Sequence, residues 1–166
     1  LKTLESRQLA SGMAEAVKVA LVKDRALFDL IEARFLDVLT RDFTDRSAMA
    51  EIMWATIVAH LDQIHTDPYE SKLARPLDYG HQWGHRLEIV TNHRLTHGEA
   101  ISVGMAIDSY ISFTRGYISA NELDRILTVF EKIGLPIYDR AASVEALWPG
   151  LESFRRHLGG ELTISL

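Results

Sequence analysis

The sequence contains no cysteine, which excludes disulfide bonds, thiolate metal sites and a cysteine nucleophile. It also lacks an excess of basic residues, because 18 Lys and Arg stand against 23 Asp and Glu and give a net charge of −5. This balance argues against nucleic acid and anionic membrane surfaces as partners. The sequence has no run of about 18 apolar residues and no signal-peptide pattern. We therefore expect a cytoplasmic protein without a membrane segment.

What is present is an ordinary globular composition. The 166 residues are 47% hydrophobic and 25% charged, which is enough for one cored domain or for one lobe of a larger protein. The chain begins with Leu1 rather than Met, so a processed chain, a cloned domain and a fragment are all open at this point.

Helical periodicity runs through most of the chain. It predicts helices over residues 11–22, 25–39, 46–61, 81–90, 97–117 and 121–133, and a shorter one from about residue 143. Ser11 is the expected N-cap of the first helix. Residues 46–61 are apolar nearly all round, which predicts a central, buried helix. Residues 161–166 alternate like a strand, so the predicted fold is an all-α helical bundle with one short terminal strand.

Four of the seven histidines fall between residues 81 and 97. His81 and His85 are four residues apart on a predicted helix, so both rings can lie on one face. Glu88, a further turn along, could orient one of the rings. His97 opens the next predicted helix, after a turn short enough to bring it back beside His81. A catalytic zinc ion needs three protein ligands of histidine or carboxylate type. This segment supplies the histidines, so a carboxylate ligand must come from elsewhere in the chain.

The histidine pair alone is ambiguous, because such pairs are more often structural or surface groups than ligands. Here Gly80 and Gly84 alternate with the two histidines. Glycine inside a helix costs about 1 kcal/mol relative to alanine, so two of them indicate close approach of backbone or ligand. The pattern therefore favours a metal site over a structural pair.

Three segments together carry a resemblance to a known family. They are SGMAEAVK at 11–18, YGHQWGHRLE at 79–88, and HGEA at 97–100 leading to Gly104 and Met105. In this order and spacing they resemble the C-terminal domain of 3-dehydroquinate synthase and its sugar phosphate cyclase relatives. The resemblance extends over essentially the whole chain.

The resemblance implies a zinc enzyme whose metal is held by Glu15, His81 and His97, although Co²⁺ would tolerate the same ligands. It implies that His85 and Lys18 contact the substrate, a phosphorylated sugar. NAD would be bound mainly by an N-terminal domain absent from residues 1–166, and the active site would lie in the cleft between the two domains. A homodimer is common among the resembling enzymes.

The reaction that the resemblance implies is a cyclisation. Bound NAD removes a hydride transiently, phosphate is eliminated, the ketone is reduced again and the opened sugar closes by an intramolecular aldol step. Zinc would act as a Lewis acid on neighbouring substrate oxygens. The nicotinamide thus returns unchanged.

Several predicted substrate-binding positions depart from the family pattern. Asp78 stands where dehydroquinate synthases usually have Asn, which resembles the cyclases that use sedoheptulose 7-phosphate, although these commonly lack the second histidine that is kept here. His60 aligns with an expected lysine, and Arg75 is displaced by one residue from a family arginine. Arg155 and Arg156 stand at the positions of a Lys–Lys pair, so planar guanidinium groups replace compact ammonium groups of the same charge. We therefore predict a substrate other than the usual carboxylated heptulosonate phosphate.

Two other functions are compatible with the sequence. A metal-dependent polyol or alcohol dehydrogenase would share the helical metal domain, but such enzymes generally have Asp or another His at the position of Glu15. Alternatively, the isolated chain is a non-catalytic metal-binding or interaction module, because it has no Gly-rich dinucleotide turn and no strand–helix unit to carry one. The cyclase remains the leading interpretation.

Overall fold

The computed structural model describes residues 4–40, 46–66 and 75–157. Within these ranges the chain forms seven α-helices and one short 3-10 turn, with no strand. The bounds are α1 Ser6–Lys23, α2 Arg25–Thr40, α3 Arg46–Thr66, η1 Pro76–Asp78, α4 His81–Val90, α5 His97–Thr114, α6 Ala120–Ile133 and α7 Val144–His157. The prediction of an all-α bundle is confirmed, whereas the strand predicted at 161–166 lies outside the described residues.

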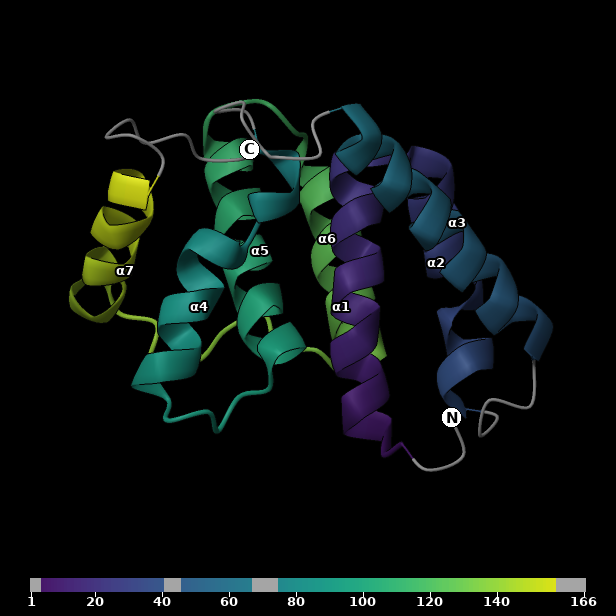
Figure 1. Cartoon of the computed structure of the whole chain (residues 1–166), viewed down its shortest axis with the longest axis horizontal. Coiled ribbons are helices and arrows are strands. Elements are labelled where there is room, and N and C mark those ends of the chain that lie inside the picture. Colours follow the sequence, from purple (N-terminus) through teal and green to yellow (C-terminus); the bar gives the residue numbers. More distant parts are fainter. Residues whose placement is uncertain (1–3, 41–45, 67–74, 158–166) are drawn as a thin grey trace.

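Helices α1 and α5 form the centre of the bundle (Figure 1). Helix α1 packs against α5 on one side and against the α2–α3 pair on the other, while α6 covers α5 and α2. Helix α4 lies alongside α5 and is covered in turn by α7. The helices that begin at His81 and His97 are therefore neighbours, and α1 passes beside them.

Two apolar clusters hold these helices together. The larger joins α1, α2, α3, α5 and α6, with Phe35, Ile31, Val17, Met105 and Phe130 almost fully buried. The smaller lies between α4, α5 and α7 and is formed by Leu87, Leu95, Ala100, Val103 and Leu147. No described helix has both the length and the apolar character needed to cross a lipid bilayer.

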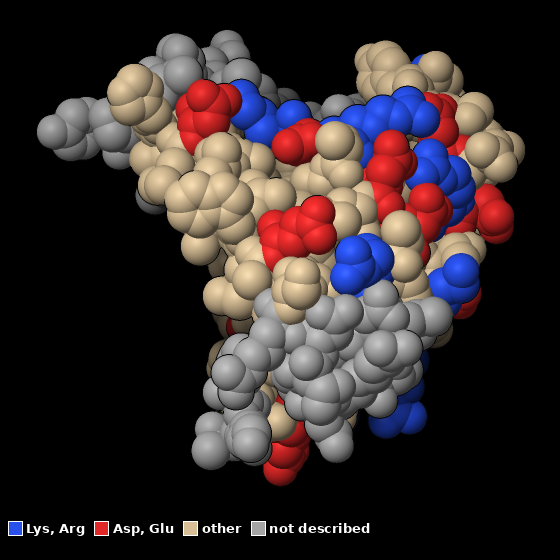
Figure 2. Space-filling model, turned by 90° about the vertical axis from the view of Figure 1, so that its right-hand side faces the viewer, with Lys and Arg blue, Asp and Glu red and all other residues tan. Residues whose placement is uncertain are grey.

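The prediction that residues 46–61 form a central, buried helix is wrong. Helix α3 lies at the edge of the bundle and buries only one face, which includes Ile52 and Ala59. Its opposite face is apolar but accessible, with Trp54 70% and Leu61 58% exposed. Figure 2 views this end of the molecule and shows charged side chains gathered on one side, beside a wide area without them. Helix α3 is therefore apolar all round because it has an exposed apolar face opposite its buried one, and not because it is buried on all sides.

The start of the first helix also differs from the prediction. Helix α1 begins at Ser6, with Glu5 as its N-cap in a reciprocal capping box with Gln8. Ser11 therefore lies inside the helix and is not its N-cap. Its Oγ instead accepts a hydrogen bond of 3.0 Å from the backbone N–H of Gly98, the second residue of α5. This contact joins the first turn of α5 to the side of α1.

Glycines allow α4 and α5 to approach so closely that their backbones are in contact. Gly80 has φ +78°, a left-handed conformation that favours glycine, and it lies directly against Gly104 of α5. A Cβ on Gly104 would overlap the carbonyl oxygen of Gly80, and one on Gly84 would meet Ile101. The close approach expected from the two motif glycines is therefore an approach between two helix backbones.

This contact gives a test of the packing. Gly104→Ala is expected to lower the free energy of unfolding by about 1–3 kcal/mol or more, because a methyl group there must push the two helices apart. Gly12→Ala is the matched control, since nothing lies within 4 Å of a Cβ at Gly12. Alanine at Gly12 should raise helix stability by up to about 1 kcal/mol. Urea unfolding of both variants measures the difference, and equal effects would contradict this account of the packing.

Candidate metal centre

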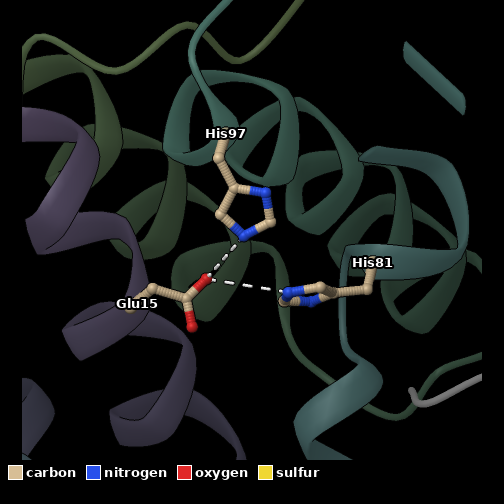
Figure 3. Close-up of side chains that lie close together, drawn as sticks. All are labelled: Glu15, His81 and His97. Carbon is tan, nitrogen blue, oxygen red and sulfur yellow. Dashed lines mark ion pairs between the residues drawn. The ribbon is translucent and has the colours of Figure 1, made fainter. Parts of the chain in front are cut away.

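Three side chains from three helices converge at one point (Figure 3). Glu15 comes from the middle of α1, while His81 and His97 are the first residues of α4 and α5. Oε1 of Glu15 lies 3.4 Å from Nε2 of His97 and 3.7 Å from Nε2 of His81. One carboxylate oxygen and two imidazole nitrogens therefore face one another.

Capping interactions fix where α5 begins and hence where His97 lies. The Thr96 side chain accepts a hydrogen bond from the Glu99 N–H, and the Glu99 carboxylate accepts one from the Thr96 N–H. Arg7 of α1 donates two hydrogen bonds of 2.7 and 2.6 Å to the same Glu99 carboxylate. Together with the Ser11–Gly98 contact, this fork holds the N-terminus of α5 against α1, beside Glu15.

The carboxylate of Glu15 is prepared to receive a cation. Its Oε2 accepts a hydrogen bond of 2.7 Å from Nζ of Lys18, whose side chain is nearly fully buried. Burial raises the pKa of Glu15, but the charge of Lys18 and its hydrogen bond outweigh that effect and leave the pKa below its usual value. Oε1 is buried and accepts no hydrogen bond from any described residue. The carboxylate is thus ionised, with one oxygen in need of a partner.

Both histidines offer a nitrogen lone pair toward Glu15. Burial, together with the charge of Lys18, lowers the pKa of His81 to about 4, so its ring is neutral at pH 7. Nδ1 of His81 lies 3.3 Å from the carbonyl oxygen of Tyr79, to which it can donate. Nδ1 of His97 lies 3.0 Å from Oε1 of Glu88. These partners assign the proton to Nδ1 in each ring and leave Nε2 available.

The arrangement fits Zn²⁺. A catalytic zinc site uses three protein ligands of histidine or carboxylate type and leaves a fourth position for water or substrate. The three candidate atoms of Glu15, His81 and His97 lie within 4.8 Å of one another. Because Oε1 of Glu15 is buried without a hydrogen bond, a cation between the three groups would also satisfy an otherwise costly polar atom.

A second group of possible ligands shares one residue with the first. His85, Glu88 and His97 also bring three candidate atoms within 4.8 Å. Here, however, Oε1 of Glu88 already lies 3.0 Å from Nδ1 of His97 and 3.4 Å from Nδ1 of His85. The sequence indicated that Glu88 could orient one ring, and the structure places it against two. Glu88 is therefore better described as an outer partner of the histidines than as a ligand.

The predicted substrate residues separate into two sets. His85, Arg75 and Asp78 line a cavity of about 480 Å³ beside His81, and α7 forms another of its walls. Within it, Nε of Arg75 lies 3.0 Å from Oδ2 of Asp78. Lys18 is not among the described residues that line this cavity, but its Nζ donates to Oε2 of Glu15. The motif residues also lie at an accessible face, since His85 is 57% exposed and His97 43% exposed.

Three other predicted substrate residues are not brought into this cavity. Arg155 and Arg156 are on α7, but neither is among the described residues that line it. Instead, Arg155 pairs with the Glu152 carboxylate at 3.2 Å, and Nε of Arg156 donates to the Glu152 carbonyl oxygen at 3.3 Å. His60 is half-buried on α3 and likewise lies outside the described lining.

One residue of the region received no role from the sequence. Asp108 of α5 is fully buried and accepts hydrogen bonds from the backbone N–H of Gly80 and from the side chains of Gln82 and Trp83. Burial raises the pKa of Asp108 to about 7, against the opposing effect of these three donors. An acidic residue among the apolar residues in the interior of α5 was the available signal.

Comparison with known proteins gives a family for this architecture. The family model described as 3-dehydroquinate synthase C-terminal matches residues 12–153, a range that contains all three converging side chains. The chain belongs to the 3-dehydroquinate synthase family of sugar phosphate cyclases. It corresponds to the helical C-terminal domain of that family, in agreement with the motif resemblance and with the seven described helices.

Individual members of the family are similar over nearly the whole chain. A 2-epi-5-epi-valiolone synthase of Actinoplanes sp. is 34% identical, with 96% of this chain and 42% of the relative covered. A 3-dehydroquinate synthase of Paenarthrobacter aurescens is also 34% identical, with 96% and 43% covered. The solved structure of 2-epi-5-epi-valiolone synthase from Streptomyces hygroscopicus subsp. jinggangensis, with NAD⁺ and Zn²⁺ bound, superposes with a TM-score of 0.92 at 30% identity. This superposition covers 98% of the present chain and 45% of the valiolone synthase chain. The chain therefore spans less than half the length of these dehydroquinate synthase relatives.

The two ligand groups can be distinguished by metal binding. Glu15→Gln is expected to lower zinc affinity by more than ~100-fold, since loss of an outer-shell partner alone costs roughly 10–100-fold. His85→Asn is the matched control and should retain one zinc ion per chain. Competition with a chromophoric chelator measures both affinities. Retention of zinc by Glu15→Gln together with its loss in His85→Asn would instead assign the metal to the Glu88 group.

Proposed function

We propose that this chain is the helical, metal- and substrate-binding domain of an NAD- and zinc-dependent sugar phosphate cyclase. The observation that carries the proposal is the convergence of an ionised Glu15, one oxygen of which lacks a hydrogen bond, with the Nε2 atoms of His81 and His97. Membership of the 3-dehydroquinate synthase family and the Zn²⁺ and NAD⁺ in the solved relative support it. The proposed reaction is elimination of phosphate from a heptulose-type phosphate, followed by intramolecular aldol closure. By bonds made and broken, this is a carbon–oxygen lyase.

Different residues of the chain would have different roles around the metal position. When bound there, zinc would supply Lewis acidity to a hydroxyl or carbonyl oxygen of the substrate. Lys18 neutralises one oxygen of Glu15 and places its own cation beside the substrate position. Nδ1 of His85 lies against Glu88, which leaves Nε2 of this accessible ring to contact the substrate and to exchange a proton with it.

The cavity beside His81 supports a phosphorylated sugar as the substrate class. Its volume of about 480 Å³ lies within the range of roughly 300–1,000 Å³ typical of small-molecule sites. The charge of Arg75 is shared with Asp78, so this pair is less suited to hold a substrate carboxylate than a free arginine would be. The Arg75–Asp78 pair therefore supports a heptulose phosphate without a carboxylate.

Hydride chemistry requires a nucleotide-binding partner for this domain. The chain covers 35–45% of the length of its relatives, which leaves room in such proteins for an N-terminal NAD-binding domain. An apolar groove of about 320 Å³ runs between α1 and α3 and reaches Glu15. We place the nicotinamide-bearing domain over this groove, because hydride transfer must occur next to the metal. The homodimer stays a prediction from the family resemblance.

Phosphate release tests the substrate directly. The protein joined to its NAD-binding domain, with zinc and catalytic NAD⁺, is expected to release phosphate from sedoheptulose 7-phosphate faster than from the carboxylated heptulosonate phosphate. The absorbance of NADH at steady state should not rise, because the cofactor is returned in its oxidised form. Phosphate release is followed with a coupled colorimetric assay.

Two results would contradict parts of this proposal. Efficient turnover of the carboxylated heptulosonate phosphate alone would overturn the choice of substrate and leave the cyclase assignment intact. Net NADH formation with a simple polyol, without phosphate release, would instead identify a polyol dehydrogenase.

A further inference from the structure

Helix α5 contains a buried carboxylate, Asp108, that does not contribute to apolar packing. Asp108 has no exposed surface and lies three helical turns after His97. Burying a charged carboxylate is strongly unfavourable unless it is well hydrogen-bonded, and an aliphatic side chain would fill the same space at lower cost. The position of this group therefore indicates a constraint beyond packing.

All three donors to Asp108 come from the segment that contains His81. The backbone N–H of Gly80 donates to Oδ2 at 2.8 Å. The Gln82 amide and the Trp83 indole donate to Oδ1 at 2.8 and 2.6 Å. Asp108 thus binds the residue immediately before His81 and the two residues immediately after it.

The next residue of α5 extends the same contact. The Ser109 hydroxyl lies 2.6 Å from the hydroxyl of Tyr79, and it also lies 2.8 Å from the Met105 carbonyl oxygen. Nδ1 of His81 faces the Tyr79 carbonyl oxygen, so anchoring Tyr79 also anchors the partner that orients the His81 ring. One turn of α5 therefore holds the residues on both sides of this histidine.

We propose that Asp108 is a positioning residue for the candidate zinc ligand His81. By fixing Gly80 in its left-handed conformation and tying down the first turn of α4, it aims Nε2 of His81 at Oε1 of Glu15. Helix α5 then supplies His97 from its own first turn and sets the direction of His81 from its fourth. The inference rests on the proposed zinc centre, but its geometric part concerns the ring of His81 alone.

The test compares Asp108→Asn with Ser102→Ala. Asparagine keeps the size of the side chain but replaces one acceptor oxygen with an NH₂ group that faces a donor. Ser102 is also buried on α5, between His97 and Asp108, but its hydroxyl donates to Glu99 and Pro136 carbonyl oxygens, away from α4. Asp108→Asn is expected to lower zinc affinity by roughly 10–100-fold, whereas Ser102→Ala should change stability only.

A second measurement needs no metal. The rings of His81 and His97 have centroids 5.3 Å apart, so nuclear Overhauser contacts between them are expected in the zinc-free protein and in Ser102→Ala. Asp108→Asn should lose these contacts while the remaining amide spectrum stays folded. Should Asp108→Asn fail to fold, Trp83→Phe removes a single donor and is expected to weaken both zinc affinity and the ring contacts to a smaller degree.

The outcomes separate this inference from the zinc proposal. Unchanged ring contacts and zinc affinity in Asp108→Asn or Trp83→Phe would overturn the positioning role, even if the wild type binds zinc tightly. If the wild type binds no zinc, and the contacts between the His81 and His97 rings are present in the wild type but absent in Asp108→Asn, the positioning role is supported and the zinc centre is overturned.

Discussion

The site depends on the close packing of α5 against α1 and α4. Gly98 lets the first turn of α5 touch α1 at Ser11, and Gly104 lets its third turn touch the backbone of Gly80, the residue before α4. Any larger side chain at these points would push the helices apart by more than the tolerance of a metal site. Since Glu15, His81 and His97 each belong to a different one of these helices, their convergence follows from the two backbone contacts.

Packing also determines the charge state of the converging groups. Burial keeps the His81 ring neutral, and the Lys18 ammonium keeps the Glu15 carboxylate ionised. Outer partners, the Tyr79 carbonyl oxygen and the Glu88 carboxylate, set which ring nitrogen carries the proton. The chain therefore presents a carboxylate oxygen and two imidazole lone pairs to the same small volume, which is the donor set that zinc prefers.

Local sequence patterns were enough to predict most of the helices, and the motif resemblance named Glu15, His81 and His97, which the structure brings together. The helix at 81–90 agrees exactly with the periodicity, and α5 begins at His97 as expected because Thr96 and Glu99 form a capping box. The burial of α3 could not be predicted, because periodicity reports which faces are apolar and not which neighbour covers them. The environment of Asp108 was missed for a related reason: its three partners lie more than 20 residues away, and only the helix packing brings them together.

The central claim is that Glu15, His81 and His97 hold one zinc ion with a position left for substrate. X-ray absorption at the zinc edge of the loaded protein, combined with anomalous scattering from its crystals, tests this claim most directly. We expect one zinc per chain, with two nitrogen ligands at about 2.0–2.1 Å and a Glu15 oxygen at about 2.0–2.2 Å, plus one exchangeable light ligand. An anomalous peak between His85, Glu88 and His97, or none near Glu15, would contradict it.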